Sequence, residues 1–422
     1  MAMTDKKQYK KSKLNMSDIV FYVALSVYTV LCVYLIMNQL AYPTTGRFEA
    51  DTPAHVSMAV DDHFMYSITA LIYLLFNFLP GSTFFIALFL AASTSGSIYL
   101  TSVLLKRVIG TYNIGLHNAI IYLCAFASNF VMGFYIERFN VQRYIGYQNA
   151  NMWHNSTYTV MRLIVLWVLL LYLDICITKD LSAKKLMVFS LVLALSTAVK
   201  PSFFVVFAPV MALELLWDWL INKNKFSSVF FQGITVVPSV IVILLQSVVL
   251  FGSDTGNGYA ISPFTALSQR GDHPKATLIL SIVFPLLVLI GHIKDVFKDR
   301  MYSFSLLIWL VGFLEVFLFT ETGTRGGDGN FFWGYSISLF VVFIQSLIIV
   351  LRDFSLIFKG SNADLDAGYC DKRSKGSLIK TRGKKIIIMF CYDVACILTY
   401  VWHFISGIIY FVLLLGGNTY FI

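Results

Sequence analysis

Residues 18–38 read DIVFYVALSVYTVLCVYLIMN, an apolar run whose one charged residue stands at its first position. A helix needs about 20 consecutive apolar residues to cross the hydrocarbon core of a bilayer. Five lysines precede the run within residues 1–17, and no small-residue cleavage site follows it before the next polar loop. The stretch therefore predicts a retained first transmembrane helix with a cytoplasmic basic tail.

The same character extends over the whole chain of 422 residues, which is 58% hydrophobic and only 13% charged. Soluble domains carry about a quarter charged residues, so this composition predicts one transmembrane domain over 1–422. A net charge of +9 would suggest nucleic-acid binding in a soluble protein. In a membrane protein the same charge is expected from basic cytoplasmic loops, and we expect no nucleic-acid partner.

The loop after the first helix, 39–82, contains the polar stretch RFEADTPAHVSMAVDDH at 47–63. Thr52 and Pro53 predict a helix start, since a hydroxyl can cap the first turn and proline costs nothing at its first position. One face of this amphipathic helix would carry Asp51, His55, Met58 and Asp62. That face could meet a substrate, or Asp51 could serve only to cap the helix N-terminus.

The remaining apolar stretches predict an all-α polytopic protein with about 11 transmembrane helices. The segment FMYSITALIYLLFNFLPGS, 64–82, is short and interrupted by Pro80-Gly81, so we interpret it as interfacial or re-entrant. The later spans are expected at 84–105, 112–134, 158–177, two short arms around Lys200-Pro201, 227–251, a span ending at 291, a span ending at 320, a span after 321–334, and a last span from 386.

The basic residues support this arrangement. All but eight of the 32 Lys and Arg residues fall in segments assigned to the cytoplasm, including 352–385, which we expect to be a cytoplasmic linker loop. The N-terminus would then be cytoplasmic and the 39–82 loop external. If 64–82 also crossed the membrane, every later loop would change sides. The eight external cations are Arg47, Arg138, Arg143, Arg162, Lys200, Arg270, Lys275 and Arg325.

Side chains that could bind an anion or a sugar gather in the external loops. Lys200 lies between two apolar arms, where a lysine is costly unless it snorkels to water or meets an anion such as phosphate. Arg325 stands in the glycine-rich loop TGTRGGDGN, whose backbone N–H groups could approach a bound anion. The further candidates for substrate binding are Arg138, Arg143, Asn151, His154, Asn330 and Trp333.

Three other features have more than one interpretation. Glu315 and Asp393 lie within apolar runs, where they could pair with a cation or mark a proton or ion path. Asn155-Ser156-Thr157 matches a glycosylation sequon, a tripeptide that is common by chance.

Taken together, these features resemble the polytopic glycosyltransferases of the C-type fold (GT-C) of the bacterial surface-polysaccharide type. Those enzymes carry an acidic residue in the first external loop, and Asp51 in DTPAH matches that position. They continue with a half-inserted amphipathic segment and a helix that ends in basic residues, which FMYSITALIYLLFNFLPGS and LLKRVIG resemble. A Lys-Pro step between two short helices is matched by STAVKPSF.

The resemblance implies an enzyme of the bacterial plasma membrane that transfers a hexosyl or pentosyl group on the external face. The donor would be a polyprenyl-phosphate sugar and the acceptor a cell-envelope glycan or lipid, with membrane lipids as the other partners. Asp51 would be the catalytic base and His55 would orient it, while Lys200 with Arg325 or Arg138 would bind the phosphate. The first loop lacks an Asp-x-Asp pair, so we predict no metal ligand; a divalent cation stays open as a cofactor.

Two rival functions remain open. A lipid-linked polysaccharide polymerase or ligase also has many spans and external arginines, but it relies on a large late external loop. A flippase or transporter of lipid-linked sugars would need a charged path through the bundle, for which Glu315 and Asp393 are the deep candidates. In a transporter Asp51 would be dispensable.

Overall fold

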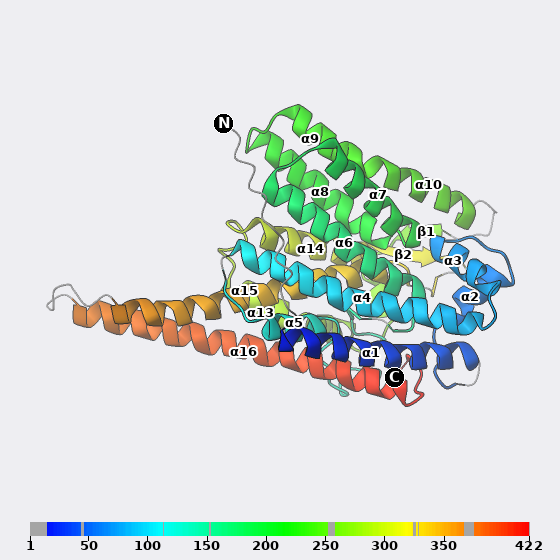
Figure 1. The fold of residues 1–422 in the computed structure, drawn as a ribbon, viewed down its shortest axis with the longest axis horizontal. Coiled ribbons are helices and arrows are strands. Elements are labelled where there is room, and N and C mark those ends of the chain that lie inside the picture. Colours follow the sequence, from blue (N-terminus) through cyan, green and yellow to red (C-terminus); the bar gives the residue numbers. More distant parts are fainter. Residues whose placement is uncertain are drawn as a thin grey trace.

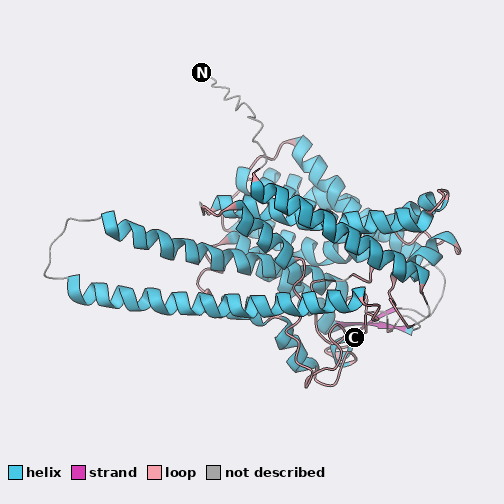
Figure 2. Ribbon diagram, turned by 60° about the horizontal axis from the view of Figure 1, so that its bottom comes forward, coloured by secondary structure: helices cyan, strands magenta, loops and turns pink. Residues whose placement is uncertain are grey.

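The computed structural model describes residues 15–43, 46–112, 114–151, 153–251, 258–323, 326–327, 329–366 and 375–421. Over these ranges the chain is mostly helical, with one two-stranded antiparallel sheet (Figures 1 and 2). The elements in chain order are α1 (Met16–Ala41), α2 (Thr52–Val60), α3 (Ile68–Asn77), α4 (Ser82–Thr111), α5 (Asn118–Ser128), α6 (Ser156–Thr178), α7 (Ala183–Val199), α8 (Ser202–Leu220), α9 (Phe226–Gly233), η1 (Ile234–Val236), α10 (Val237–Phe251), β1 (Gly258–Ile261), α11 (Thr265–Ser268), α12 (Pro274–Ser281), α13 (Val283–Gly291), α14 (Arg300–Leu318), β2 (Phe319–Thr322), α15 (Phe332–Asp366) and α16 (Lys375–Leu415).

Eight described helices are long and apolar enough to cross a membrane, or nine if the bent pair α12–α13 forms one span. The all-α polytopic prediction is therefore confirmed, whereas the count of about 11 is not. The long helices run side by side, and α2, α3 and both strands gather at one end of the bundle (Figure 1). We call this the α2 end, and the opposite end, where α14 begins, the far end.

The predicted span 112–134 is the largest difference from expectation. Among its described residues only α5 is helical, and its 11 residues extend about 16 Å, too short to cross a bilayer. After α5 the chain is irregular but buried, with its backbone bonded to other elements: the amide of Met132 donates to the carbonyl of His403 (3.1 Å), and that of Phe134 to Leu280 (2.9 Å). Non-helical backbone is tolerated inside a membrane protein when other protein groups satisfy it in this way.

The buried side chain of Arg162 in α6 also holds this irregular segment. It donates to the side-chain oxygens of Asn151 and Asn129 and lies over the Phe340 ring at 3.9 Å. Arg162 was expected among the external cations, but it is 7% exposed and faces the bundle interior. The guanidinium therefore has a structural role, since it ties the loop before α6 to the core.

The predicted span that ends at 291 is broken into α12 and α13, which meet at an angle of 63°. Pro285 explains the break. Proline lacks an N–H group and its ring clashes with the carbonyl four residues earlier, here Ser281, the last residue of α12.

Proline also shapes the turn between α7 and α8. A residue that precedes proline is disfavoured in helical geometry, and Lys200 accordingly adopts extended backbone angles (φ −160°, ψ 123°) before Pro201. This turn lies at the α2 end, where the Lys200 side chain donates to Thr157. The short segment 64–82 contains α3, whose 10 residues are too few to span a bilayer.

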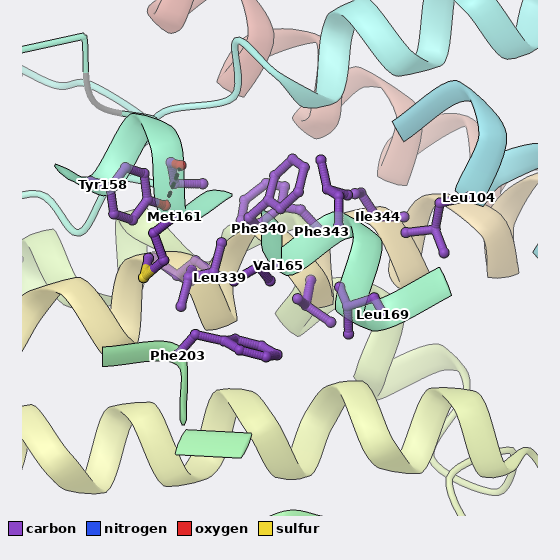
Figure 3. Close-up of a cluster of buried hydrophobic side chains, with 14 of the residues drawn as sticks. Leu104, Tyr158, Met161, Val165, Leu169, Phe203, Leu339, Phe340, Phe343 and Ile344 are labelled. Carbon is purple, nitrogen blue, oxygen red and sulfur yellow. Dashed lines mark hydrogen bonds between the residues drawn. The ribbon is translucent and has the colours of Figure 1, made fainter. Parts of the chain in front are cut away.

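The core is centred on α15, which packs against α4, α5, α8, α13, α14 and α16. In its most apolar window, 94% of the residues are buried. Figure 3 shows how Phe340 and Phe343 of α15 meet side chains of α6 such as Met161 and Val165, with Leu104 and Phe203 closing the cluster. This packing fixes the start of α15 against the start of α6, where several predicted site residues lie.

The two last helices extend beyond the bundle at the far end (Figures 1 and 2). We expected a linker loop over 352–385, but α15 continues to Asp366 and α16 begins at Lys375. Within that stretch, residues 367–374 lie outside the described part of the chain.

Candidate functional site

The site at the α2 end is built around Asp51, which precedes the first residue of α2. Its carboxylate makes no capping bond to the helix backbone. Instead, Oδ2 accepts a hydrogen bond from Nδ2 of Asn155 (2.9 Å) and lies 3.8 Å from Nε2 of His154. The Asp51 side chain keeps 30% of its surface exposed, so the carboxylate is accessible to solvent.

Backbone contacts hold Asp51 in this position. Its amide donates to the carbonyl of His154 (3.0 Å), and the hydroxyl of Thr52 donates to the same oxygen (3.1 Å). The start of α2 is therefore tied to the loop that leads into α6. Two stretches about 100 residues apart in sequence meet here, which the loop composition alone did not predict.

Asn155 connects the carboxylate to a cation through a chain of hydrogen bonds. Its Oδ1 accepts from the hydroxyl of Thr157 (2.9 Å), and that hydroxyl accepts from Nζ of Lys200 (3.2 Å). The same Oδ1 caps α6 by accepting from the amide of Tyr158 (2.9 Å). Because the amide is bonded at both its nitrogen and its oxygen, its orientation is determined, and so is the relative position of Asp51 and Lys200.

His55, one turn into α2, lies beside the same amide. Its Nε2 is 3.4 Å from Nδ2 of Asn155, while Nδ1 is buried without a hydrogen-bond partner among the described residues. Burial, together with the positive charge of Lys200, lowers the pKa of His55 to about 4, although Asp51 acts in the opposite direction. The imidazole is therefore neutral at pH 7 and can orient a partner without adding charge.

His154 is enclosed by aromatic rings and is 1% exposed. It stacks on Tyr420 with ring centroids 4.3 Å apart and meets the edge of Tyr144 at 4.5 Å. Burial lowers its pKa, and Lys200 acts in the same direction, while Asp51 opposes both. The hydroxyl of Tyr420 hydrogen-bonds to Asp51, so the C-terminal segment supplies one wall of the site.

Lys200 completes the arrangement. Its ammonium group lies 4.6 Å from the ring centroid of Trp333, a cation–π distance, and Trp333 in turn packs against Tyr158. Five of the residues predicted from sequence therefore lie together at the α2 end: Asp51, His55, His154, Lys200 and Trp333.

The other predicted substrate-binding residues lie elsewhere or have other partners. Arg138 is exposed in a turn, and Arg143 lies over the Tyr135 ring at 3.9 Å; neither contacts Asp51 in the described structure. Asn151 is buried and donates to the carbonyl of Val131 (2.7 Å). Asn330 is bonded through its backbone and side chain to Glu321, so it shapes the turn after β2. Arg325 lies outside the described residues.

Three residues of the site were not predicted as ligands: Asn155, Tyr420 and Arg270. Arg270 donates to the carbonyl of Gly327 (3.1 Å), lies over the Phe332 ring, and is close enough to lower the pKa of Tyr420. A tyrosine two residues from the end of the chain gives no local signal of this role. Asn155 did stand out, but as a sequon; its burial and its bonds to Asp51 and Tyr158 leave no room for a glycan.

The two deep acids do not form one path. Glu315 is buried three residues before the end of α14, at the α2 end, whereas Asp393 is buried near Arg352 and Asp353 at the far end. The far end also contains a cavity of about 570 Å³ between α4, α6, α14 and α15. Its wall is mainly apolar, with Glu214, Asp295, Asp299, Arg300 and Arg352 among the polar lining residues.

No protein-family model matches this chain, and no curated protein matches it either.

Proposed function

We propose that this protein is an integral-membrane glycosyltransferase that uses a polyprenyl-phosphate sugar at the α2 end. The observation that carries the proposal is the hydrogen-bond chain from Asp51 through Asn155 and Thr157 to Lys200. It holds a partly exposed carboxylate and an ammonium group in a fixed relation, beside the aromatic ring of Trp333. Sugar transfer from a phosphate needs a base and a cation placed in this way.

In the proposed reaction the acceptor hydroxyl loses its proton to the Asp51 carboxylate as its oxygen bonds to the anomeric carbon. The bond from that carbon to the phosphate oxygen breaks, and the electron pair leaves with the polyprenyl phosphate. Lys200 offsets the negative charge that develops on the phosphate. The neutral imidazole of His55 orients the Asn155 amide and thereby the carboxylate. Trp333 is 7% exposed, and its ring lies 4.6 Å from the Lys200 ammonium group, which it helps to position.

The orientation that we propose places the α2 end on the external face of a bacterial plasma membrane. The described basic residues support it, because Lys106 and Arg107 near the end of α4 and Arg300 at the start of α14 lie at the far end. A donor with a long lipid would reach the site from the outer leaflet, and a cell-envelope glycan or lipid would be the acceptor.

The direct test is Asp51→Asn in purified protein, assayed for release of polyprenyl phosphate from a panel of polyprenyl-phosphate sugars. A general base contributes about 10²- to 10⁴-fold, so we expect at least about a 100-fold lower rate. Asp62→Asn is the matched control, because Asp62 is an exposed acid just past the end of α2. Turnover by Asp51→Asn at the wild-type rate would exclude Asp51 as the base.

The cavity at the far end favours a second candidate function, transport of a lipid-linked sugar. An apolar cavity of this size could accept part of a lipid chain. In that case the double variant Glu315→Gln with Asp393→Asn should abolish transport into proteoliposomes, while Asp51→Asn should transport normally. The two acids lie at opposite ends of the bundle, which makes this the weaker candidate.

A further inference from the structure

A second group of ligand-type side chains lies at the far end, apart from the Asp51 site. His292 follows the last residue of α13, Asp353 lies on α15 and Asp393 on α16. One ligand atom from each of these three residues lies within 4.8 Å of the others. Three separate elements therefore direct one nitrogen and two carboxylates at a common point.

Both carboxylates are buried, and one lacks any hydrogen bond. Asp393 is 0% exposed and Asp353 is 5% exposed. Neither oxygen of Asp393 has a hydrogen-bond partner within the described ranges. A buried charge without a partner is costly, so the carboxylate of Asp393 needs a cation or a proton that the described side chains do not supply.

The hydrogen bonds around His292 leave one ring nitrogen turned toward the cluster. Nδ1 lies 3.3 Å from Oδ2 of Asp295, and Nε2 lies 3.6 Å from Oδ2 of Asp353. A histidine that ligates a metal commonly donates its other N–H to a carboxylate in this manner, which fixes the tautomer and the ring orientation. With its proton on Nδ1, His292 presents the lone pair of Nε2 to the common point.

The charges nearby leave an excess of carboxylates. Arg352 bonds through Nε to Asp353 (2.9 Å), reaches Asp295 at 2.6 Å and lies 3.9 Å from Asp299. The Arg352 guanidinium thus contacts three carboxylates. Asp393 is a fourth acid, and in the part of the chain described it has no hydrogen bond to Arg352. A divalent ion would offset most of this excess negative charge.

The positions of the ligands are fixed by close packing. An added Cβ at Gly291 would overlap the Tyr392 ring, and the Tyr392 hydroxyl donates to the carbonyl of Leu287. These contacts join α13 to α16 at the residues directly before His292 and Asp393. The site therefore does not depend on a loose loop.

We propose that His292, Asp353 and Asp393 bind a divalent transition-metal ion that joins the end of α13 to α15 and α16. The imidazole ligand favours zinc, and the two carboxylates also suit manganese, whereas magnesium and calcium prefer oxygen ligands alone. The ion would hold the two long helices where they leave the bundle. This inference is independent of the sugar-transfer proposal, because its test measures the ion and not turnover.

The experiment uses full-length protein in detergent, with any affinity tag removed and bound metal stripped with a chelator. Equilibrium dialysis against Zn²⁺ or Mn²⁺, followed by elemental analysis, should give about one ion per chain. The midpoint of thermal unfolding should rise with Zn²⁺ or Mn²⁺ because an ion that binds only the folded state stabilises it. Mg²⁺ at the same concentration should leave the midpoint unchanged.

Two ligand variants and one matched control locate the ion. Asp393→Asn and His292→Gln should each weaken binding at least about tenfold. Glu315→Gln removes a buried acid of the same kind at the α2 end and should bind as wild type does. The electron paramagnetic resonance spectrum of Mn²⁺ gives a signature of bound ion that does not rely on stability.

Three outcomes would overturn the proposal. Wild type that binds no ion at 1 mM free Zn²⁺ or Mn²⁺ would mean that an imidazolium or a shared proton holds the cluster together. Retention of full affinity by both ligand variants would place the ion elsewhere. Loss of affinity in Glu315→Gln as well would show a general effect on folding and not a local site.

Discussion

At the scale of single residues, the α2-end site depends on Asn155. Its Nδ2 holds the Asp51 carboxylate, and its Oδ1 both caps α6 and accepts from Thr157. A carboxamide, which presents a donor and an acceptor on one planar group, occurs only in asparagine and the longer glutamine, and aspartate would place a second negative charge beside Asp51. The residue therefore sets both the geometry and the charge of the site.

The depressed pKa of His55 leads to a prediction about stability and pH. The folded value is about 4, and the ordinary value is 6.5, so the unfolded chain binds more protons between these two values. Stability is then complete above pH 6.5 and falls as the pH drops toward 4, by about 3 kcal/mol at about 1.4 kcal/mol per pH unit. Thermal unfolding of purified protein at pH 7, 5.5 and 4.5 should show this decline.

His55→Gln provides the comparison, because glutamine does not titrate. The variant should lose less stability than wild type over the same pH range, with His154 accounting for part of the loss that remains. An identical decline in variant and wild type would mean that His55 is solvated and protonates without penalty.

The residues that could be predicted were those whose surroundings made them conspicuous. Asp51 and His55 stand in a polar loop, and Lys200 interrupts an apolar run, so local composition marked each of them. Tyr420 is distant from Asp51 in sequence and has no polar surroundings of its own. Asn151 was predicted to bind substrate, yet in the structure its side chain accepts a hydrogen bond from the buried Arg162.

At the scale of elements, the irregular segment after α5 is held by α16. Gly407 lies so close to Phe130 that an added Cβ would overlap the Phe130 carbonyl. One turn earlier, Nδ1 of His403 lies 2.6 Å from the carbonyl oxygen of Met132. The last helix thus provides both the space and the hydrogen bonds for a stretch of backbone that is not helical.

We predict that Gly407→Ala destabilises the protein by at least about 2 kcal/mol, because a backbone carbonyl cannot move aside as a side chain can. Gly110→Ala is the control: Gly110 is also helical, but nothing lies within 4 Å of an added Cβ. That change should be neutral or stabilising by up to about 1 kcal/mol. The midpoint of thermal unfolding in detergent measures both, and equal midpoints would refute the close approach.

The sequence predicted that most apolar segments are helices, but it did not predict where such a helix is interrupted. A run such as 112–134 has the hydropathy of a span, but hydropathy does not reveal that Asn129 and Gly133 bond across to other elements. Pro285 did carry a signal for the break between α12 and α13, since proline ends a helix a turn before it.

At the scale of the whole molecule, the arrangement of charge predicts which end faces the cytoplasm. Single cysteines can test it in a background without native cysteines. Asp62→Cys at the α2 end should react with a membrane-impermeant maleimide in intact cells, and Lys294→Cys at the far end should react only after permeabilisation. Both positions are exposed, so access to the reagent depends on side alone. The reverse labelling pattern would invert the topology and place the Asp51 site inside.

The fold class, an all-α polytopic membrane protein, could be predicted from the sequence. Hydropathy and charge are sums over residues, so they can be calculated without knowing which residues are in contact. The packing of α15 in the centre could not, since the apolar run of this helix has the same mean hydropathy, 2.2, as the run Phe226–Val249. In the apolar window of α15, 94% of the residues are buried, compared with 11% in the window of Phe226–Val249. Sequence hydropathy therefore did not distinguish the most enclosed helix from one that faces outward.

The equal hydropathy of an enclosed helix and an outward-facing one bears on how the protein is inserted into the membrane. In the finished protein α15 is enclosed by other helices, so contact with lipid does not require its high hydropathy. During synthesis, however, each span must partition from the translocation machinery into the bilayer before its neighbours are in place, and every apolar side chain contributes to that step. The hydropathy of α15 is thus a requirement of insertion. We therefore expect polar substitutions on this helix to weaken insertion as well as packing.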